Sequence, residues 1–422
     1  MKNVEAYDVS AWGYVHNCTS LADAVMCGVR ENGVYHVDTE AGVLDILSKN
    51  MECLRPGGTI LVGFNGAVSN RSGKKAPFFS GARISDNIKV PLVSISDPSL
   101  ALDKNLPLAW YAGNEWLPDL QSELSLALNE VHNAINADML FFGGSGGGFA
   151  ALAVAAKVDF CAKVLVWNPQ TSILDYNFGF VRQYVNACFP TSVGRYVAGC
   201  DAGQTLSLYK KIFDEFNITH SLQGAFQYSN VDVFYLQNKS DWHFGKHAIP
   251  FLKSHDIVKG DEGWVSNSRF GIRFIEGGWG NRHAPLPKDI LERALLEVIE
   301  GEDMSSVADN LTSLCGYDEG VKTLDVFSNA ELSGEIFPNK IRAGFEVSSS
   351  FRDVSIEYAF YLLVDGVRTN VRWYEKDRFV EFVNFTCQED GQKIEIVGFV
   401  RDGNGEKMSK RILLRSREPA NG

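Results

Sequence analysis

The stretch Phe141-Phe142-Gly143-Gly144-Ser145-Gly146-Gly147-Gly148-Phe149-Ala150 decides the fold. It contains a G-x-S-x-G motif, with the apolar run 138–142 before it and the small-residue run 149–158 after it. This order is typical of a strand, a sharp turn and a helix, in which flanking residues without a Cβ let the backbone and the helix approach closely. We therefore predict Ser145 as a nucleophile and the Gly146 N–H, at the helix start, as an oxyanion donor.

Two other roles of a glycine-rich loop compete with this interpretation: close packing of a helix on a strand, and cradling of a phosphate. No Gly-Lys-Ser or Gly-Lys-Thr follows the glycines, which excludes a P-loop. A dinucleotide-binding turn usually opens the first strand–helix–strand unit of its domain, whereas this turn falls late in the expected sheet. The context therefore favours the nucleophile.

The region from about 34 to 300 alternates short apolar runs with helical patterns, as in a mostly parallel sheet covered by helices. Amphipathic helices are predicted at 118–134 and 287–300. The segment at about 172–229 is too long for a simple crossover and is predicted to form a cap. The predicted strands are 59–64, 90–96, 138–142, 163–167, 231–237 and 269–275.

The period changes after about residue 325. Strand-like runs between Ile341 and Leu414, separated by turn signals such as Asp365-Gly366, show no helical pattern. This spacing predicts an antiparallel β-sandwich. The runs Tyr358-Ala359-Phe360-Tyr361-Leu362 and Trp373-Tyr374 resemble those of immunoglobulin-like accessory domains. We therefore expect an α/β domain over 1–325, which carries the cap, and a separate accessory domain over 326–422.

If Ser145 is a nucleophile, a carboxylate and a histidine should follow in that order, each just past a later strand. Asp241 follows the run 231–237, and His283 follows the run 269–275. His283 would take the proton of Ser145, and Asp241 would hold the other ring nitrogen. The second oxyanion donor is expected in the turn after 59–64, at the backbone of Phe64 or Asn65.

Other polar residues fall near the same edge of the sheet. Asp241-Trp242-His243-Phe244-Gly245-Lys246-His247 also has the i, i+4 histidine spacing of a metal site, but it lacks the HExxH glutamate and leaves the serine turn unexplained. We favour a substrate pocket lined by Gly144, Asn168, Gln170, His243 and His247, with a simple Asn-Pro turn as an equal alternative for the segment 168–171. Asp97-Pro98 and Trp110-Tyr111 lie similarly and could be structural.

Composition limits the partners of the 422-residue chain. Lys and Arg number 40 against 52 Asp and Glu, so a net charge of −12 argues against nucleic acid as a partner. No apolar stretch approaches the ~20 residues of a membrane span, and the two acids near the start do not suit a signal peptide, so the cytoplasm is expected. The eight cysteines form no CxxC pair, and we expect neither a metal nor another cofactor.

At these residues the chain resembles the α/β-hydrolase superfamily. GGSGGGFAAL (143–152), NPQT (168–171) and QNKSDWHFGKH (237–247) are similar to a bacterial branch associated with capsular polysaccharide biosynthesis and with accessory secretion of glycosylated adhesins. The resemblance covers roughly residues 35–300. It implies Ser145, Asp241 and His283 as a triad, and acyl chemistry on sugars, including O-acetyl transfer. An HGGG oxyanion motif, common in esterases, is missing.

The resulting hypothesis is a serine esterase or O-acetyltransferase that acts on an acylated carbohydrate or glycan through an acyl-enzyme. Association with polysaccharide-assembly proteins is a further expectation from the resemblance. Two alternatives remain: a catalytically silent glycan-binding or scaffolding subunit, and a metal-dependent hydrolase that uses Asp241, His243 and His247.

Overall fold

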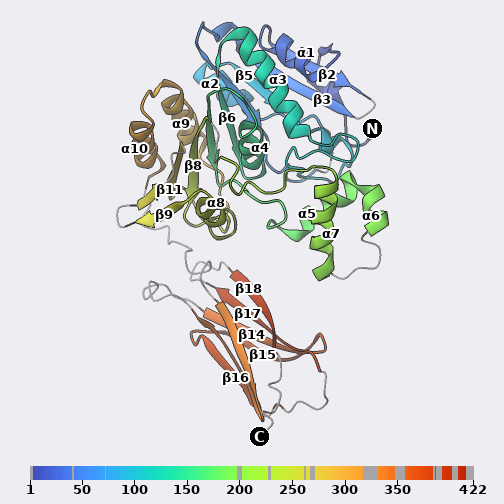
Figure 1. The fold of residues 1–422 in the computed structure, drawn as a ribbon, viewed down its shortest axis with the longest axis vertical. Helices are drawn as coiled ribbons and strands as arrows, with labels where there is room; N and C mark the ends of the chain where they lie inside the picture. The colour runs from blue at the N-terminus through green and yellow to red at the C-terminus, as the bar shows by residue number, and fades with distance from the viewer. Residues whose placement is uncertain are drawn as a thin grey trace. The chain divides into compact units, whose positions relative to one another are not determined.

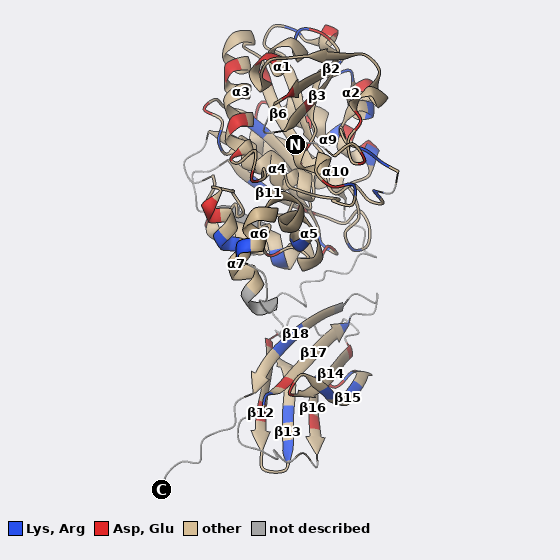
Figure 2. Cartoon of the chain, turned by 90° about the vertical axis from the view of Figure 1, so that its right-hand side faces the viewer, with Lys and Arg blue, Asp and Glu red and all other residues tan. Residues whose placement is uncertain are grey.

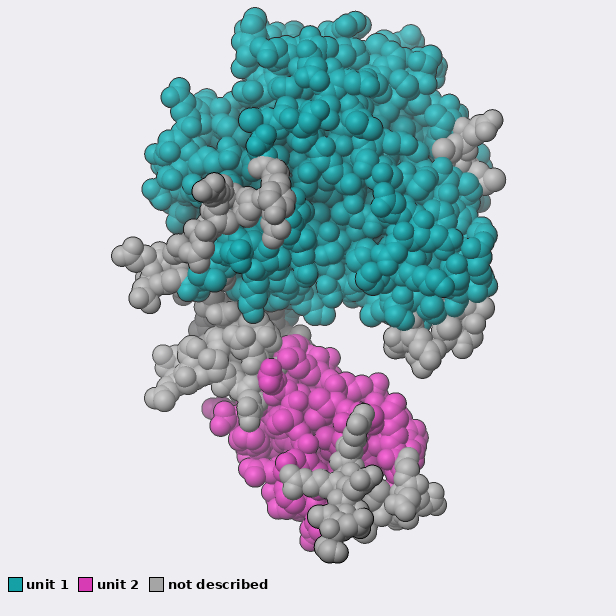
Figure 3. Space-filling model, in the orientation of Figure 1, with its two compact units in different colours: residues 1–322 teal, residues 323–422 magenta. Residues whose placement is uncertain are grey.

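The chain forms two compact units, Met1–Lys322 and Thr323–Gly422, in a computed structural model (Figure 3). The structure describes residues 3–39, 42–71, 73–196, 202–226, 230–260, 263–266, 271–316, 331–346, 357–383, 385, 392–401 and 407–414. The predicted domain border at 325–326 and the first two residues of the predicted strand 269–275 lie outside these ranges. Of the described helices, none is both long and apolar enough to cross a membrane.

Unit 1 is built on a nine-stranded sheet with the order β1-β2-β3-β5-β4-β6-β7-β8-β11. All neighbours pair in parallel except β3, which is antiparallel to both β2 and β5. The mostly parallel sheet predicted from the sequence is therefore confirmed. Its strands are β1 (Val15–Asn17), β2 (Gly33–Asp38), β3 (Val43–Lys49), β4 (Thr59–Phe64), β5 (Leu92–Ile95), β6 (Asp138–Gly144), β7 (Ala162–Trp167), β8 (Val231–Asn238) and β11 (Ile272–Gly277), and a hairpin of β9 (Ile257–Gly260) and β10 (Gly263–Ser266) stands apart.

Helices cover both faces of this sheet (Figure 1). One apolar cluster joins the sheet to α1 (Leu21–Gly28), α3 (Leu120–Ile135), α4 (Gly146–Ala155) and α8 (Ile249–Ser254). The other joins it to α2 (Ala82–Ile88), α9 (Lys288–Glu300) and α10 (Met304–Cys315). Short helical turns lie at Val9–Trp12, Met51–Cys53, Pro98–Ala101 and Phe244–Ala248.

The central strand β6 shows why the two faces form. Its side chains alternate, so that Met139 and Phe141 enter one cluster while Leu140 and Phe142 enter the other. All four are almost completely buried, and each large apolar side chain removed from water contributes roughly 1.5–3 kcal/mol. A continuous apolar run is therefore what this position requires.

The cap predicted at about 172–229 lies between β7 and β8. It contains α5 (Phe178–Cys188), α6 (Pro190–Tyr196) and α7 (Ala202–Glu215), while 197–201 and 227–229 are outside the described residues. Its buried aromatic side chains, among them Tyr184, Phe189 and Phe213, pack with the same cluster as α4. Figure 2 shows both Lys and Arg and Asp and Glu distributed over unit 1, while α3 has only acidic charged residues.

Unit 2 is an antiparallel β-sandwich. One sheet has the order β12-β13-β16 and the other β15-β14-β17-β18, the first-second-fifth and fourth-third-sixth-seventh arrangement of immunoglobulin-like domains. Inward side chains such as Ile341, Phe345 and Phe360 form its core. The strands are β12 (Glu331–Phe337), β13 (Lys340–Glu346), β14 (Glu357–Val364), β15 (Val367–Glu375), β16 (Phe379–Val383), β17 (Ile394–Arg401) and β18 (Lys407–Leu414).

Candidate active site

Ser145 occupies a strained bend between β6 and α4. Its φ is +54° and its ψ is −120°, a conformation that non-glycine residues rarely adopt. Flanking glycines make room for the bend: a Cβ on Gly144 would lie 2.2 Å from Trp167 Nε1, and one on Gly147 would lie 2.5 Å from the Phe64 carbonyl oxygen. Glycine is therefore required on both sides of the serine.

His283 lies in the loop after β11, and its Nε2 is 3.0 Å from Ser145 Oγ. Its Nδ1 is 2.7 Å from Oδ2 of Asp241, which lies in the turn after β8. Asp241 is fully buried, and its Oδ1 accepts the backbone N–H of His243 over 2.9 Å. The structure thus brings together the three residues predicted as a triad, each just beyond the carboxyl end of a strand.

This arrangement defines a proton path. When Nδ1–H of His283 donates to Asp241, the lone pair on Nε2 faces the Ser145 hydroxyl and can accept its proton. The buried carboxylate favours the imidazolium that then forms, because opposite charges at close range stabilise one another in a poorly solvated site. The His283 ring remains partly exposed, so a substrate can reach it.

Gln170 connects Ser145 to the protein interior. Its side-chain Nε2 donates to Ser145 Oγ over 3.1 Å, and its backbone N–H donates to the Ser145 carbonyl oxygen over 3.1 Å. Its Oε1 accepts the indole N–H of Trp110. Gln170 is fully buried, so it orients Ser145 from the side of the protein interior.

The predicted oxyanion donors surround the bend unequally. Gly146 begins α4, where the first N–H groups have no intrahelical partner. The Asn65 N–H donates to Tyr111 Oη over 3.0 Å, so a substrate oxygen would have to compete with that hydroxyl, and Phe64 is the last residue of β4. Gly66, the residue after Asn65, also lies beside the bend: a Cβ placed on it would be 4.0 Å from Ser145 Cβ.

Asn168 is buried and holds neighbouring segments together. Its Oδ1 accepts the backbone N–H of Asn238 over 2.8 Å, and its Nδ2 donates to the carbonyl oxygen of Ala284 over 2.9 Å. Asn168 therefore ties the end of β8 to the loop that carries His283. Gly144, at the end of β6, is half-buried against Trp167.

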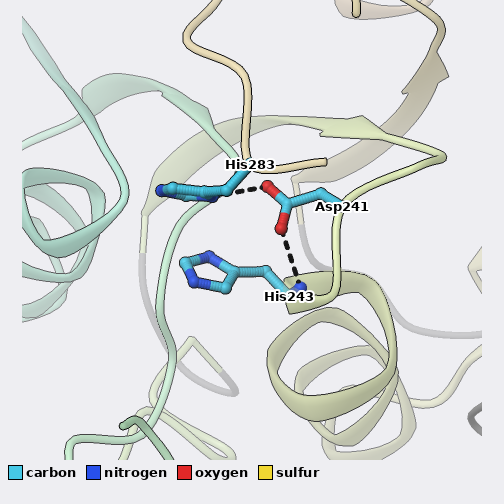
Figure 4. Close-up of side chains that lie close together, drawn as sticks. All are labelled: Asp241, His243 and His283. Atoms are coloured by element: carbon cyan, nitrogen blue, oxygen red, sulfur yellow. Dashed lines mark hydrogen bonds and ion pairs between the residues drawn. The ribbon is translucent and has the colours of Figure 1, made fainter. Parts of the chain in front are cut away.

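His243 and His247 are both fully buried beneath the triad. Figure 4 shows the His243 ring beside that of His283, with ring centroids 4.2 Å apart, and Asp241 between His283 and the His243 backbone. His243 Nδ1 lies 2.9 Å from the Asn168 carbonyl oxygen and must donate to it, whereas His247 Nδ1 accepts the Thr171 N–H over 3.3 Å. Burial lowers the pKa of each histidine to about 3, so both rings are neutral at neutral pH.

The side chains that could hold a metal ion here differ from the set considered from the sequence. Within the described ranges, one group of three His, Cys, Asp or Glu side chains could hold an ion. It consists of Asp241, His243 and His283, whose ligand atoms lie within 4.8 Å of one another. His247 is not in this group. Both oxygens of Asp241 already accept hydrogen bonds, one of them from His283, so an ion here would compete with that triad contact. His243 donates from Nδ1, and its Nε2 has no hydrogen-bond partner among the described residues.

Some residues of the site were assigned no role from the sequence. Trp110 and Tyr111 both have positive φ and are buried, an arrangement that bulky residues rarely adopt. Asp97 Oδ2 accepts the Tyr111 N–H over 2.7 Å, and burial raises the pKa of Asp97 to about 6. Tyr176, from the cap, stacks on Trp242 with centroids 5.5 Å apart. The sequence pointed to some of these residues in one way: the segments 97–98 and 110–111 were expected near the same edge of the predicted sheet as the triad.

The mostly parallel sheet, the bend after β6 and the order Ser145, Asp241, His283 give the chain an α/β-hydrolase fold. Searches against protein-family models and curated proteins return no match. Similar solved structures include the capsule O-acetyltransferase of Neisseria meningitidis serogroup A (13% identity, TM-score 0.42, over 63% of this chain and 94% of that one). Also similar is a poly(3-hydroxybutyrate) depolymerase from Bordetella parapertussis (12% identity, TM-score 0.37, over 69% of this chain and 98% of that one). So is an S-formylglutathione hydrolase from Agrobacterium tumefaciens (12% identity, TM-score 0.35, over 67% of this chain and 95% of that one). At such identities these likenesses concern the fold and carry nothing about the substrate.

Proposed function

We propose that the chain is a serine acyl-transfer enzyme, an esterase or O-acetyltransferase, with Ser145 as nucleophile. The observation that carries this proposal is the continuous hydrogen-bonded series from Ser145 Oγ through His283 to the buried Asp241. A structural serine would need neither the strained backbone nor an imidazole at 3.0 Å.

The reaction has two steps. Ser145 Oγ attacks the acyl carbonyl carbon while its proton passes to His283 Nε2, and the proton then goes to the departing alcohol oxygen as the old ester bond breaks. In the second step, His283 removes a proton from water or from an acceptor hydroxyl, whose oxygen attacks the acyl-serine carbonyl carbon. The bond between the acyl group and Ser145 Oγ then breaks, and His283 returns the proton to Oγ. The Gly146 and Gly66 N–H groups are our candidates for stabilising the oxyanion.

The substrate class that we propose is an acylated sugar or glycan. This part rests on the resemblance of 143–152, 168–171 and 237–247 to proteins associated with bacterial polysaccharide biosynthesis. In the same proposal, unit 2 is an accessory domain and polysaccharide-assembly proteins are partners. Water and a sugar hydroxyl remain as the two acceptors that the reaction allows.

Labelling with a fluorophosphonate tests the nucleophile. We expect the native chain to be modified once, at Ser145, with loss of ester hydrolysis, and Ser145→Ala to be neither labelled nor active. Ser313→Ala, on the exposed side of α10, is the matched control and should behave as the native chain. An unlabelled native chain, or equal labelling of Ser145→Ala, would rule the proposal out; sugar binding without turnover would then favour a silent glycan-binding subunit.

A further inference from the structure

A basic pocket of about 620 Å³ lies in unit 1 beside the candidate active site. Four segments form its walls: the N-terminal segment at Glu5, the loop after β4, the chain around Asn105, and helix α5 of the cap. Its volume falls within the roughly 300–1,000 Å³ that small-molecule sites occupy. Its charged lining residues are Glu5, Arg71, Lys74, Lys75 and Lys104.

Two walls of this pocket continue directly into the nucleophile bend. Ala67 lines the pocket and follows Gly66, where a Cβ would lie 4.0 Å from Ser145 Cβ. Pro107 also lines it and precedes Leu108, whose Cδ1 would be 2.5 Å from a Cβ on Gly146. Adjacent α-carbons are ~3.8 Å apart, so the pocket begins about one residue from the groups that flank Ser145.

The cap closes a third side. Phe180 and Gln183 of α5 line the pocket, and the Phe180 ring lies 5.4 Å from the ring of Tyr176. Tyr176 in turn packs against His243 and Trp242 under the triad. A series of contacting rings, Phe180, Tyr176 and His243, therefore links the pocket to the catalytic His283.

The charge of this pocket is opposite to that of the chain. Four cations meet one carboxylate here, although the whole chain has a net charge of −12. Lys104 pairs with Glu5, while Lys74 and Lys75 are exposed and form no ion pair with a described carboxylate. A concave wall of one charge sign concentrates the field in its opening and attracts ions of the other sign.

Arg71 adds a positive charge beneath the lysines. It is buried, and its guanidinium donates to the carbonyl oxygens of Leu106 and Leu100 over 2.9 and 3.0 Å. Its Nε has no partner among the described residues. Asp103 and Asp97 attract its charge electrostatically, but neither forms an ion pair with it among the described residues. The guanidinium therefore adds a positive charge to the pocket floor, which Asp103 and Asp97 reduce but do not pair with directly.

We infer that this pocket binds an anionic group, a phosphate or a carboxylate, carried by the acyl ester that Ser145 attacks. This inference rests on the proposed function, which it extends to a charged class of substrate. The exposed ammonium groups of Lys74 and Lys75 contact the anion, and Arg71 contributes its field from below. The bound anion places the acyl group at the neighbouring bend.

The test compares three esters on the full chain: 6-O-acetylglucose, 6-O-acetylglucose 1-phosphate and an O-acetylated glucuronate. We expect KM for at least one anionic ester to be about tenfold or more below that of the neutral ester. In Lys74→Ala/Lys75→Ala this advantage should fall about tenfold, while Lys253→Ala, an exposed lysine on α8, should retain it. Equal KM values for all three esters, or an advantage that survives the double substitution, would overturn the inference.

Direct binding separates this inference from the proposed function. Calorimetric titration of glucose 1-phosphate and of glucuronate requires no turnover, and we expect binding that is lost in Lys74→Ala/Lys75→Ala and weakened by 0.5 M salt, a concentration at which charges are screened beyond about 4 Å. Such binding without hydrolysis of any ester would sustain the anion site and refute the acyl-transfer proposal. Ester hydrolysis without binding of either anion would support the acyl-transfer proposal and refute the anion site.

Discussion

The side-chain amide of Gln170 donates a hydrogen bond to the hydroxyl oxygen of Ser145 over 3.1 Å. An indole N–H can only donate, so its contact from Trp110 requires the oxygen of Gln170 on that side and the NH₂ group on the serine side. The buried indole therefore decides which end of the amide faces the nucleophile. Asp97 supports this arrangement through its hydrogen bond from the Tyr111 backbone.

Gln170→Met should lower kcat/KM for ester hydrolysis about two- to tenfold, since a lost hydrogen bond between neutral groups of roughly 0.5–1.5 kcal/mol corresponds to that range. The volume is nearly conserved, so the fold should persist. Trp110→Phe, which removes the orienting N–H but leaves the amide, should have a smaller effect. Steady-state kinetics on one neutral ester checks both, and unchanged values for Gln170→Met would contradict the positioning role.

Asp241→Asn should lower kcat by about 10⁴-fold, because an amide favours the wrong tautomer of His283 and cannot stabilise its cation. Asp241 now accepts hydrogen bonds from the His283 imidazole and from the His243 backbone N–H. In the variant, the amide NH₂ group would have to face one of these two donors. Asp256→Asn is the matched control, an exposed carboxylate whose positive φ suits asparagine. Single-turnover kinetics should show a loss confined to acylation and deacylation; retention of a tenth of the native rate would oppose the triad.

Removal of divalent ions should leave ester hydrolysis unchanged. The proposed reaction needs no ion, because Asp241 and His283 already satisfy one another. Dialysis against a chelator followed by kinetics, with elemental analysis of the same sample, is the measurement. A loss of activity that added zinc or manganese restores would support a metal-dependent hydrolase on Asp241, His243 and His283 instead.

Acid should destabilise unit 1 through His247. Burial lowers the pKa of His247 in the native state to about 3, below its ordinary value of 6.5. Between these two pH values the unfolded chain therefore binds more protons than the native chain. Stability therefore falls as the pH drops from about 6.5 toward 3, by up to about 1.4 kcal/mol per pH unit for this group. His247→Gln removes the titrating ring and should flatten the curve of unfolding free energy against pH. Urea titrations at pH 7, 5.5 and 4.5 test this, and parallel curves for the two chains would contradict it.

The sequence predicted the parts of the fold that depend on hydrophobic periodicity and on special turns. The strand predicted at 59–64 coincides with β4, and the helix predicted at 287–300 matches α9 within one residue. Strands β1 to β3 had no such prediction. β1 is a short edge strand, and buried polar residues such as His36 and Asp45 interrupt the apolar runs of β2 and β3. The antiparallel direction of β3 follows from its tertiary pairing. Helix α10 begins at an Asp303 side chain that caps Ser306, a signal that the sequence does contain.

The candidate site divides in the same way. The order of Ser145, Asp241 and His283 after successive strands follows from the topology of such sheets, and it could be predicted. The positive φ of Trp110 and Tyr111 could not, since local preference opposes it and tertiary contacts, among them those of Asp97 and Gln170, hold the turn. The basic pocket likewise collects residues far apart in the chain, such as Glu5 and Gln183.

Gly147→Ala should destabilise unit 1 by about 1–3 kcal/mol, the usual cost of forcing an extra methyl group into a packed site. The added Cβ would lie 2.5 Å from the Phe64 carbonyl oxygen, a backbone atom that cannot move without disturbing β4. Gly194→Ala, on exposed helix α6 with nothing within 4 Å of its Cβ position, should instead stabilise by up to about 1 kcal/mol. Urea denaturation measures both changes. If Gly147→Ala were as stable as Gly194→Ala, the close contact between the bend and β4 would be wrong, and with it the position of the Gly66 N–H as an oxyanion donor.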